Sequence, residues 1–359
     1  MSQRNLAIQR EQTRSSVLWG FGKMCHFYFV KSLIDLAYRE RELPITGIRR
    51  IGRRNSLLQV LKIIKSYLLA ELTIKGGMRM APTQLTDQQM AFFDTFGYLY
   101  FPGLLADCVD KIIDEFEKIW IAHGGGHHGK PHDGENRSCI FPFPDQSEYL
   151  SSLLDDPRIH DIAASICGDD FNYTSGDGNL YAGDTNWHSD GYDGKRILSI
   201  KIAFYLDRLT RDSGAIRVIP GSHRVGESYA DGIEQSIRES GKIWGMHGTE
   251  VPAAILETTP GDIVVFNHNL KHAAFGGPAR RRMYTMNFCR RYPQDRIEEL
   301  RTKLGHEARF WTERIHGEAM IRTAGPERMV HLEQVMENDT HLAELAREHK
   351  RTRHEPSRG

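Results

Sequence analysis

The sequence has few cysteines and no net charge. Its 359 residues include five cysteines, and none of them forms a CxxC pair. A scattered, odd-numbered set is typical neither of a secreted disulfide scaffold nor of a zinc finger. Basic and acidic side chains each number 47, so the formal net charge at pH 7 is zero. We therefore expect no nucleic-acid partner, because global electrostatic attraction to nucleic acid is missing.

Long apolar runs are also absent. The most apolar early stretch, residues 17–38, is interrupted by Lys23, His26, Lys31 and Asp35. No uninterrupted run reaches the roughly 18 residues that indicate a transmembrane helix, and no secretory signal pattern starts the chain. The composition, 40 % apolar and 26 % charged, suffices for a buried core. These features predict a soluble, cytoplasmic protein.

The zero net charge hides two opposite blocks. Residues 1–80 carry a net charge of +10, and the remainder carries −10. From Leu57 onward, leucines and isoleucines recur on one helical face, with Lys62 and Lys65 at its edge. Such a helix packs on the protein's own body, lies on a membrane or docks on a partner, and these alternatives stay open. We expect residues 1–79 to form a basic helical extension that need not belong to the working domain.

The residue pattern changes twice along the rest of the chain. We expect a new domain to begin after Met80, and short predicted strands separated by Gly, Pro, Asn and Asp then continue to about Arg291. This pattern is typical of an antiparallel sandwich or barrel. We predict a working β domain over residues 80–292 and a charged helical extension over residues 293–359. The histidine- and glycine-rich run at 123–132 is expected to be a mobile surface loop rather than a ligand cluster, because its glycines oppose a helix.

A Trp-His-Ser-Asp run carries the strongest chemical signal. Positions i and i+2 of a strand point to the same side, so His188 and Asp190 can present an imidazole and a carboxylate to one point. His272 follows another predicted strand. Two histidines and one carboxylate on one face form the facial triad of non-haem Fe(II) oxygenases. The His-x-Asp pair alone is common, and its weight comes from the surrounding strands.

The chain resembles the phytanoyl-CoA dioxygenase family of Fe(II)/2-oxoglutarate oxygenases. The resemblance covers about residues 84–291 and rests on the ordered segments LTDQQ…FGYLYFPGLL, LLDDPRIHDIAASICGDD, WHSD, SGAIRVIPGSHR, GDIVVF…H and RRMYTMNF. It implies a mainly β fold, a double-stranded β-helix (a jelly-roll, cupin-like barrel) with flanking α-helices. It also implies an enzyme, a dioxygenase that hydroxylates or desaturates a small organic molecule.

The resemblance assigns cofactors and residues. Fe(II) would bind His188, Asp190 and His272, with 2-oxoglutarate and O2 as co-substrates. The far carboxylate of 2-oxoglutarate would pair with Arg281 or Arg282, because a guanidinium meets a carboxylate through two hydrogen bonds. Strand alternation favours Arg281, since it shares the more polar face with Met283, Thr285 and Asn287. Two further residues, Lys201 and Asn179, are candidates for cofactor binding, because the strands that carry them can place their side chains in the pocket.

Two other functions remain compatible with these residues. One is a metal-binding or regulatory protein on the same barrel without turnover, and the other is a cupin-type metalloenzyme that needs no 2-oxoglutarate. The complete ligand set and the arginine favour the oxygenase.

Overall fold

The computed structural model describes residues 84–192 and 197–359. All of these residues belong to one compact unit. The predicted basic extension over residues 1–79 lies outside the described residues. Within the described ranges, no helix is both long and apolar enough to cross a membrane.

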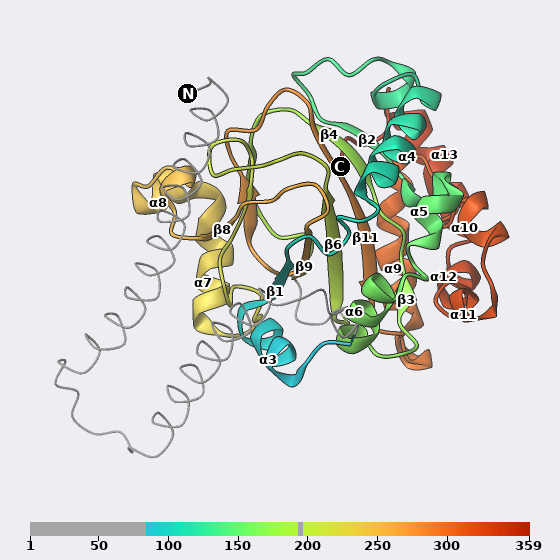
Figure 1. The fold of residues 1–359 in the computed structure, drawn as a ribbon, viewed down its shortest axis with the longest axis horizontal. Helices are drawn as coiled ribbons and strands as arrows, with labels where there is room; N and C mark the ends of the chain where they lie inside the picture. The colour runs from blue at the N-terminus through green and yellow to red at the C-terminus, as the bar shows by residue number, and fades with distance from the viewer. Residues whose placement is uncertain (1–83, 193–196) are drawn as a thin grey trace, which may run out of the picture. The chain divides into compact units, whose positions relative to one another are not determined.

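Eleven described strands form two antiparallel sheets, which confirms the predicted jelly-roll fold with flanking helices (Figure 1). The larger sheet has the order β1-β9-β6-β11-β4-β2, and β3 pairs with β11. The smaller sheet has the order β5-β10-β7-β8. The strands are β1 (Tyr98–Phe101), β2 (Ser138–Ile140), β3 (Asn172–Tyr173), β4 (Gly178–Tyr181), β5 (Thr185–His188), β6 (Ser199–Tyr205), β7 (Ile216–Val218), β8 (Ala254–Leu256), β9 (Ile263–Asn267), β10 (His272–Ala274) and β11 (Arg281–Cys289).

Side-chain alternation along β6 and β11 divides the core in two. One face of each strand packs against helices, and it includes Phe204 and Tyr284, whose rings stack 4.3 Å apart. The other face, with Tyr205 and Met283, packs against the smaller sheet. A strand presents alternate residues to opposite faces, so the same two strands supply both the helix-covered core and the interior of the barrel.

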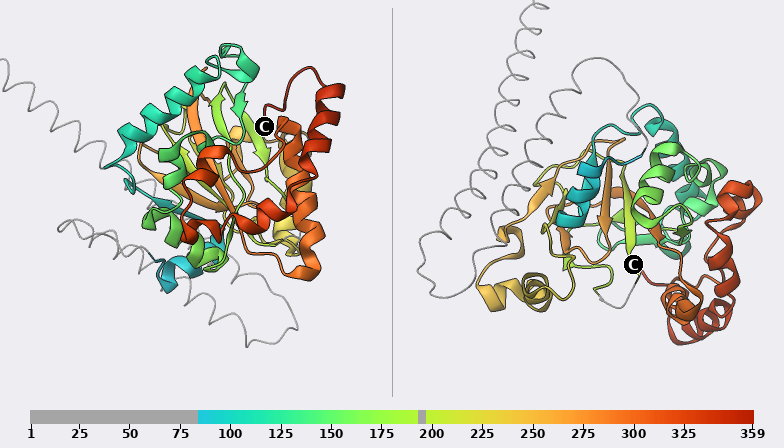
Figure 2. Two further views of the ribbon diagram at one scale, coloured as in Figure 1. Left: turned by 90° about the vertical axis from the view of Figure 1, so that its right-hand side faces the viewer. Right: turned by 90° about the horizontal axis from the view of Figure 1, so that it is seen from below.

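Helices cover the outer face of the larger sheet and one side of the smaller sheet (Figures 1 and 2). The first group is α3 (Asp87–Phe96), α4 (Val109–Ala122), α5 (Glu148–Ser152) and α6 (Pro157–Cys167). Two helices, α7 (Ser228–Ser236) and α8 (Ser240–Trp244), lie beside the smaller sheet. The C-terminal group is α9 (Ile297–Gly305), α10 (Glu318–Arg322), α11 (Pro326–Met329), α12 (Glu333–Asn338) and α13 (Leu342–Thr352). Short 3-10 turns join these elements, and one of them, η6, spans His306–Phe310.

The C-terminal helices share the core of the β domain. Met320 and Leu332 are fully buried in the same apolar cluster as the outer face of the larger sheet. A second cluster joins Cys289, at the end of β11, to Leu300 and Leu304 of α9. Residues 293–359 therefore pack on the barrel as an integral layer, although their sequence is outside the family resemblance.

The turn between α3 and β1 depends on a glycine. Thr86 starts α3 with a capping box, and Gly97 ends it in the left-handed conformation at φ 84°. A Cβ atom on Gly97 would lie 2.4 Å from Nδ1 of His223. The imidazole of His223 is thus packed directly on the backbone of this turn, and it is 9 % exposed.

Acid should weaken the fold through His223. Burial lowers the pKa of His223 to about 4, whereas an unfolded histidine titrates near its ordinary value of 6.5. Between these values the unfolded chain binds a proton that the folded chain does not, so stability is complete above pH 6.5 and is lost as the pH falls. We expect a loss of about 2 kcal/mol from this group between pH 7 and pH 5. Urea unfolding at both pH values should show a smaller pH dependence in His223→Gln than in wild type. Equal pH dependence in the two proteins would contradict this assignment.

Candidate metal centre and its cavity

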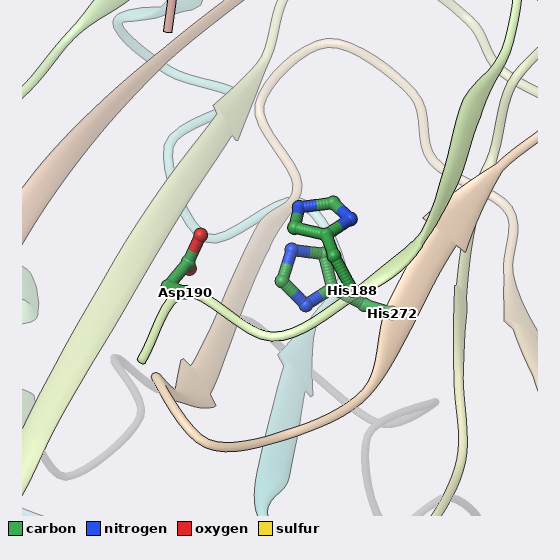
Figure 3. Close-up of side chains that lie close together, drawn as sticks. All are labelled: His188, Asp190 and His272. Carbon is green, nitrogen blue, oxygen red and sulfur yellow. The ribbon is translucent and has the colours of Figure 1, made fainter. Parts of the chain in front are cut away.

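Three potential metal ligands lie close together, at the end of β5 and at the start of its partner strand β10. His188 is the last residue of β5 and His272 is the first of β10, and the two are direct partners in the antiparallel ladder. Asp190 follows two residues after His188, and one ligand atom from each of the three residues lies within 4.8 Å of the others. Figure 3 shows the two imidazoles close to each other, with Asp190 beside them on the loop after β5. The centroids of the two rings are 4.2 Å apart.

Main-chain contacts orient each of the three groups. Nδ1 of His188 lies 2.7 Å from the carbonyl oxygen of Asn186, and Nδ1 of His272 lies 2.9 Å from that of Leu270. A carbonyl oxygen only accepts, so Nδ1 carries the proton in both rings and Nε2 keeps its lone pair for a metal. The backbone N–H of Asp190 donates to the carbonyl oxygen of His268 at 2.9 Å.

The electrostatics of the cluster suit a divalent cation. Burial opposes ionisation of Asp190, but the ammonium of Lys201, 3.0 Å away, and the nearby imidazoles outweigh it and hold the pKa of Asp190 well below its usual range. Burial, and then the proximity of His188, lower the pKa of His272 to about 3. An ionised carboxylate and neutral imidazoles are the forms that bind metals. The donor set, two nitrogens and one carboxylate, fits non-haem Fe(II).

The cluster lines a cavity of about 430 Å³ inside the barrel. Arg281 lines this cavity beside Tyr181, with its Cζ 4.8 Å from the ring centroid. Thr185 and Tyr205 also line the cavity. The wall includes residues of both sheets and of the C-terminal segment, among them Lys303, Glu307, Arg309 and Phe310. The cavity size is that of a small-molecule site.

The two candidate arginines lie on opposite faces of β11. Arg281 is 3 % exposed and lines the cavity, where its Nη1 donates to the carbonyl oxygen of Gly214. Arg282 instead bonds Asp207 at 2.7 Å and Glu117 at 3.0 Å. Neither carboxylate belongs to the residues that line the cavity, whereas Arg281 and Met283 do. The guanidinium of Arg282 is therefore engaged by acidic side chains of the protein itself.

The other two candidates take different places. Lys201 lines the cavity and pairs with Asp190, so it contacts a predicted metal ligand rather than standing free in the pocket. Asn179 is fully buried; its Oδ1 accepts a hydrogen bond from Nε of Arg137 at 2.8 Å, and its Nδ2 donates to Asp177 at 2.9 Å. Asn179 thus supports two residues of the cavity wall.

Sequence reasoning missed the charged residues on the wall. Arg137 forms an ion pair with Asp177 at 2.6 Å, and both line the cavity. Lys303 and Glu307 stand one helical turn apart, and this spacing was a usable signal for a shared face. Burial raises the pKa of Glu307, although Arg309 at 3.6 Å opposes this effect. No local motif marks Arg137 or Asp177, because their pairing joins residues 40 positions apart.

The histidine-rich run differs from the expected mobile loop. The ring nitrogens of His127 contact the main-chain oxygens of Cys139 at 3.2 Å and Pro356 at 3.1 Å. His132 contacts the hydroxyl of Ser138 at 2.8 Å and the main-chain oxygen of Ala279 at 2.7 Å. Two histidines therefore fasten this segment to the barrel and to the C-terminal residues.

A jelly-roll barrel with two histidines and a carboxylate converging in its interior defines a class of metal-dependent proteins. The model of the family described as "Phytanoyl-CoA dioxygenase (PhyH)" matches residues 93–283. The chain therefore belongs to the phytanoyl-CoA dioxygenase family, as its sequence motifs predict.

Individual relatives are more distant. An ectoine dioxygenase from Sphingopyxis alaskensis is 29 % identical over 175 residues, which are 41 % of this chain and 55 % of that protein. The chain thus spans about half the length of this curated relative. One similar solved structure is the non-heme alpha ketoglutarate dependent carbocyclase SnoK from nogalamycin biosynthesis, with 19 % identity and a TM-score of 0.47 over 61 % of this chain and 91 % of that chain. Another is EctD from S. alaskensis with bound Fe, with 22 % identity and a TM-score of 0.44 over 60 % of this chain and 80 % of that chain.

Proposed function

We propose that this protein is an Fe(II)/2-oxoglutarate-dependent dioxygenase that hydroxylates or desaturates a small organic molecule and releases succinate and CO2. The observation that carries the proposal is the convergence of His188, Asp190 and His272 in a cavity that also contains Arg281. Family membership and the iron-bound relative support the same assignment.

Different residues would bind the metal, the co-substrate and the substrate. His188, Asp190 and His272 would hold Fe(II), which supplies oxidative decarboxylation of 2-oxoglutarate coupled to attack on a C–H bond. Arg281 would receive the far carboxylate of 2-oxoglutarate, because it is the buried guanidinium on the cavity wall and lies beside Tyr181. The barrel walls exclude water and position the substrate.

The remaining wall suggests a polar substrate. Arg137, Lys303 and Arg309 contribute positive charge, and Asp177 and Glu307 contribute negative charge. Polar wall groups lose their water when a ligand enters, so a ligand here gains most when it carries charged or hydrogen-bonding groups that replace those contacts. We therefore propose a small substrate with such groups rather than a purely apolar one.

Succinate formation tests the proposal directly. Purified full-length protein with Fe(II), 2-oxoglutarate and O2 should release succinate, and omission of the metal should stop the release. A protein that binds metal but releases no succinate with any member of a panel of polar small molecules would favour the non-catalytic alternative. Turnover of such a molecule without 2-oxoglutarate would favour a cupin-type metalloenzyme.

A further inference from the structure

We propose that Glu234 is a positioning residue for the metal centre, because its carboxylate ties the segment that carries His188 and Asp190 to the segment that carries His272. Glu234 lies on α7, outside the sheets that bear the three ligands. The inference rests on the proposed function, since it concerns the metal site of that function.

The first contact of Glu234 is with Ser189, the residue between the proposed ligands His188 and Asp190. The hydroxyl of Ser189 donates to Oε2 of Glu234 at 3.2 Å. Ser189 stands between His188 and Asp190, where β5 has already ended. Strand pairing therefore holds His188 against His272, but it does not extend to Asp190. A side-chain contact at Ser189 limits how far this loop can move.

The second contact of Glu234 is with Lys271, the residue before the proposed ligand His272. Nζ of Lys271 lies 2.9 Å from the same oxygen of Glu234, and the Lys271 side chain is fully buried. Nζ also donates to the carbonyl oxygens of Ser222, at 2.9 Å, and Asn269, at 3.2 Å. A buried ammonium needs such partners, so Lys271 and the start of β10 have few alternative positions.

Helix α7 makes a further contact with the loop that carries Asp190. The Tyr192 hydroxyl donates to Asp231, which is three residues before Glu234 on α7. The Tyr192 ring also covers Nζ of Lys271 at 3.0 Å from its centroid. One turn of α7 thus contacts both ligand-bearing segments, which makes the separation of Asp190 and His272 depend on that turn. Groups outside the ligand set commonly tune metal affinity in this way.

Cobalt titration of the full-length apoprotein tests the role of Glu234. We expect Glu234→Gln to raise the Kd for Co(II), followed by its visible absorption, about tenfold. Ser189→Ala, which removes one tie only, should raise it less. The KM for 2-oxoglutarate at saturating metal should stay unchanged, because Arg281 lies on a different strand. Glu239→Gln is the matched control, since the ion pair of Glu239 joins Lys242 on the surface, 3.1 Å away, and not Ser189 or Lys271.

A second variant separates positioning from stability. Glu234→Leu combined with Lys271→Met removes the buried ammonium together with its partly exposed carboxylate partner, which often preserves stability, but it also removes the tie to Ser189. Weak Co(II) binding by this folded double variant would support the proposal, and wild-type affinity would overturn it. If His188→Ala binds Co(II) as well as wild type does, the proposed metal site itself is wrong. If His188→Ala loses Co(II) but the Glu234 variants do not, only the role of Glu234 is wrong.

Discussion

Replacement of His188 or Asp190 by alanine should abolish Fe(II) binding and all 2-oxoglutarate turnover. Three ligand atoms lie within 4.8 Å of one another, so each variant leaves only two protein ligands. Two monodentate ligands bind a divalent ion far more weakly than three pre-oriented ones do, and here both histidines are oriented by main-chain carbonyls. Metal content after dialysis and succinate release measure the two losses separately.

The two variants should differ in stability. His188→Ala removes a half-buried ring, whereas Asp190→Ala leaves the ammonium of Lys201 without its partner at 3.0 Å. The side chains of Lys201 and Asp190 are only 15 % and 20 % exposed, so the loss of the carboxylate leaves a largely shielded ammonium uncompensated and should destabilise the fold more than the loss of the His188 ring. His123→Ala, at an exposed position after α4, is the control for loss of a histidine as such. Either ligand variant with more than a few per cent of wild-type succinate release would disprove the ligand assignment.

The second large effect concerns the two neighbouring arginines. Arg281→Ala should raise the KM for 2-oxoglutarate by about 30- to 1,000-fold, which corresponds to a loss of roughly 2–4 kcal/mol from a charge-assisted pair in a shielded site. Arg282→Ala should leave this KM near the wild-type value. It should lower thermal stability instead, because it breaks ion pairs with Asp207 and Glu117.

A conservative change sharpens the comparison. Arg281→Lys keeps the positive charge but offers no planar fork, so its KM should fall between those of wild type and Arg281→Ala. Initial rates at saturating Fe(II) provide all of these values. A large rise in KM for Arg282→Ala, with Arg281→Ala near wild type, would reverse the assignment of the two faces of β11.

The sequence was sufficient to predict which side chains of a strand share a face. Alternation in RRMYTMNF separates Arg281 from Arg282, and alternation in RILSIKIAFYLD puts Lys201 opposite the apolar Ile200 and Ile202. The same alternation appears in the structure, where Lys201 lines the cavity and Ile202 is fully buried under the helices. Period-2 patterns need only local information, so they were predictable.

Contacts between remote segments were not predictable in this way. Arg137 meets Asp177, and Lys303 reaches the hydroxyl of Ser199 at 2.8 Å from a helix 104 residues further along the chain. The spacing of Lys303 and Glu307 indicates a shared helical face, but the local sequence does not show whether that face meets the cavity or solvent. The anchoring of His127 by Pro356 also depends on how the C-terminal residues return to the barrel.

The placement of α9 and η6 on the cavity wall has an evolutionary consequence. The proposed ligands of the metal lie on β5, the loop after it and β10, while Lys303, Glu307 and Arg309 come from a segment outside residues 93–283. Substitutions at 303–310 can therefore reshape the chamber without disturbing the strands that carry the reactive centre. Related proteins could acquire new substrates by exchange of this one stretch, and the inherited chemistry would stay constant.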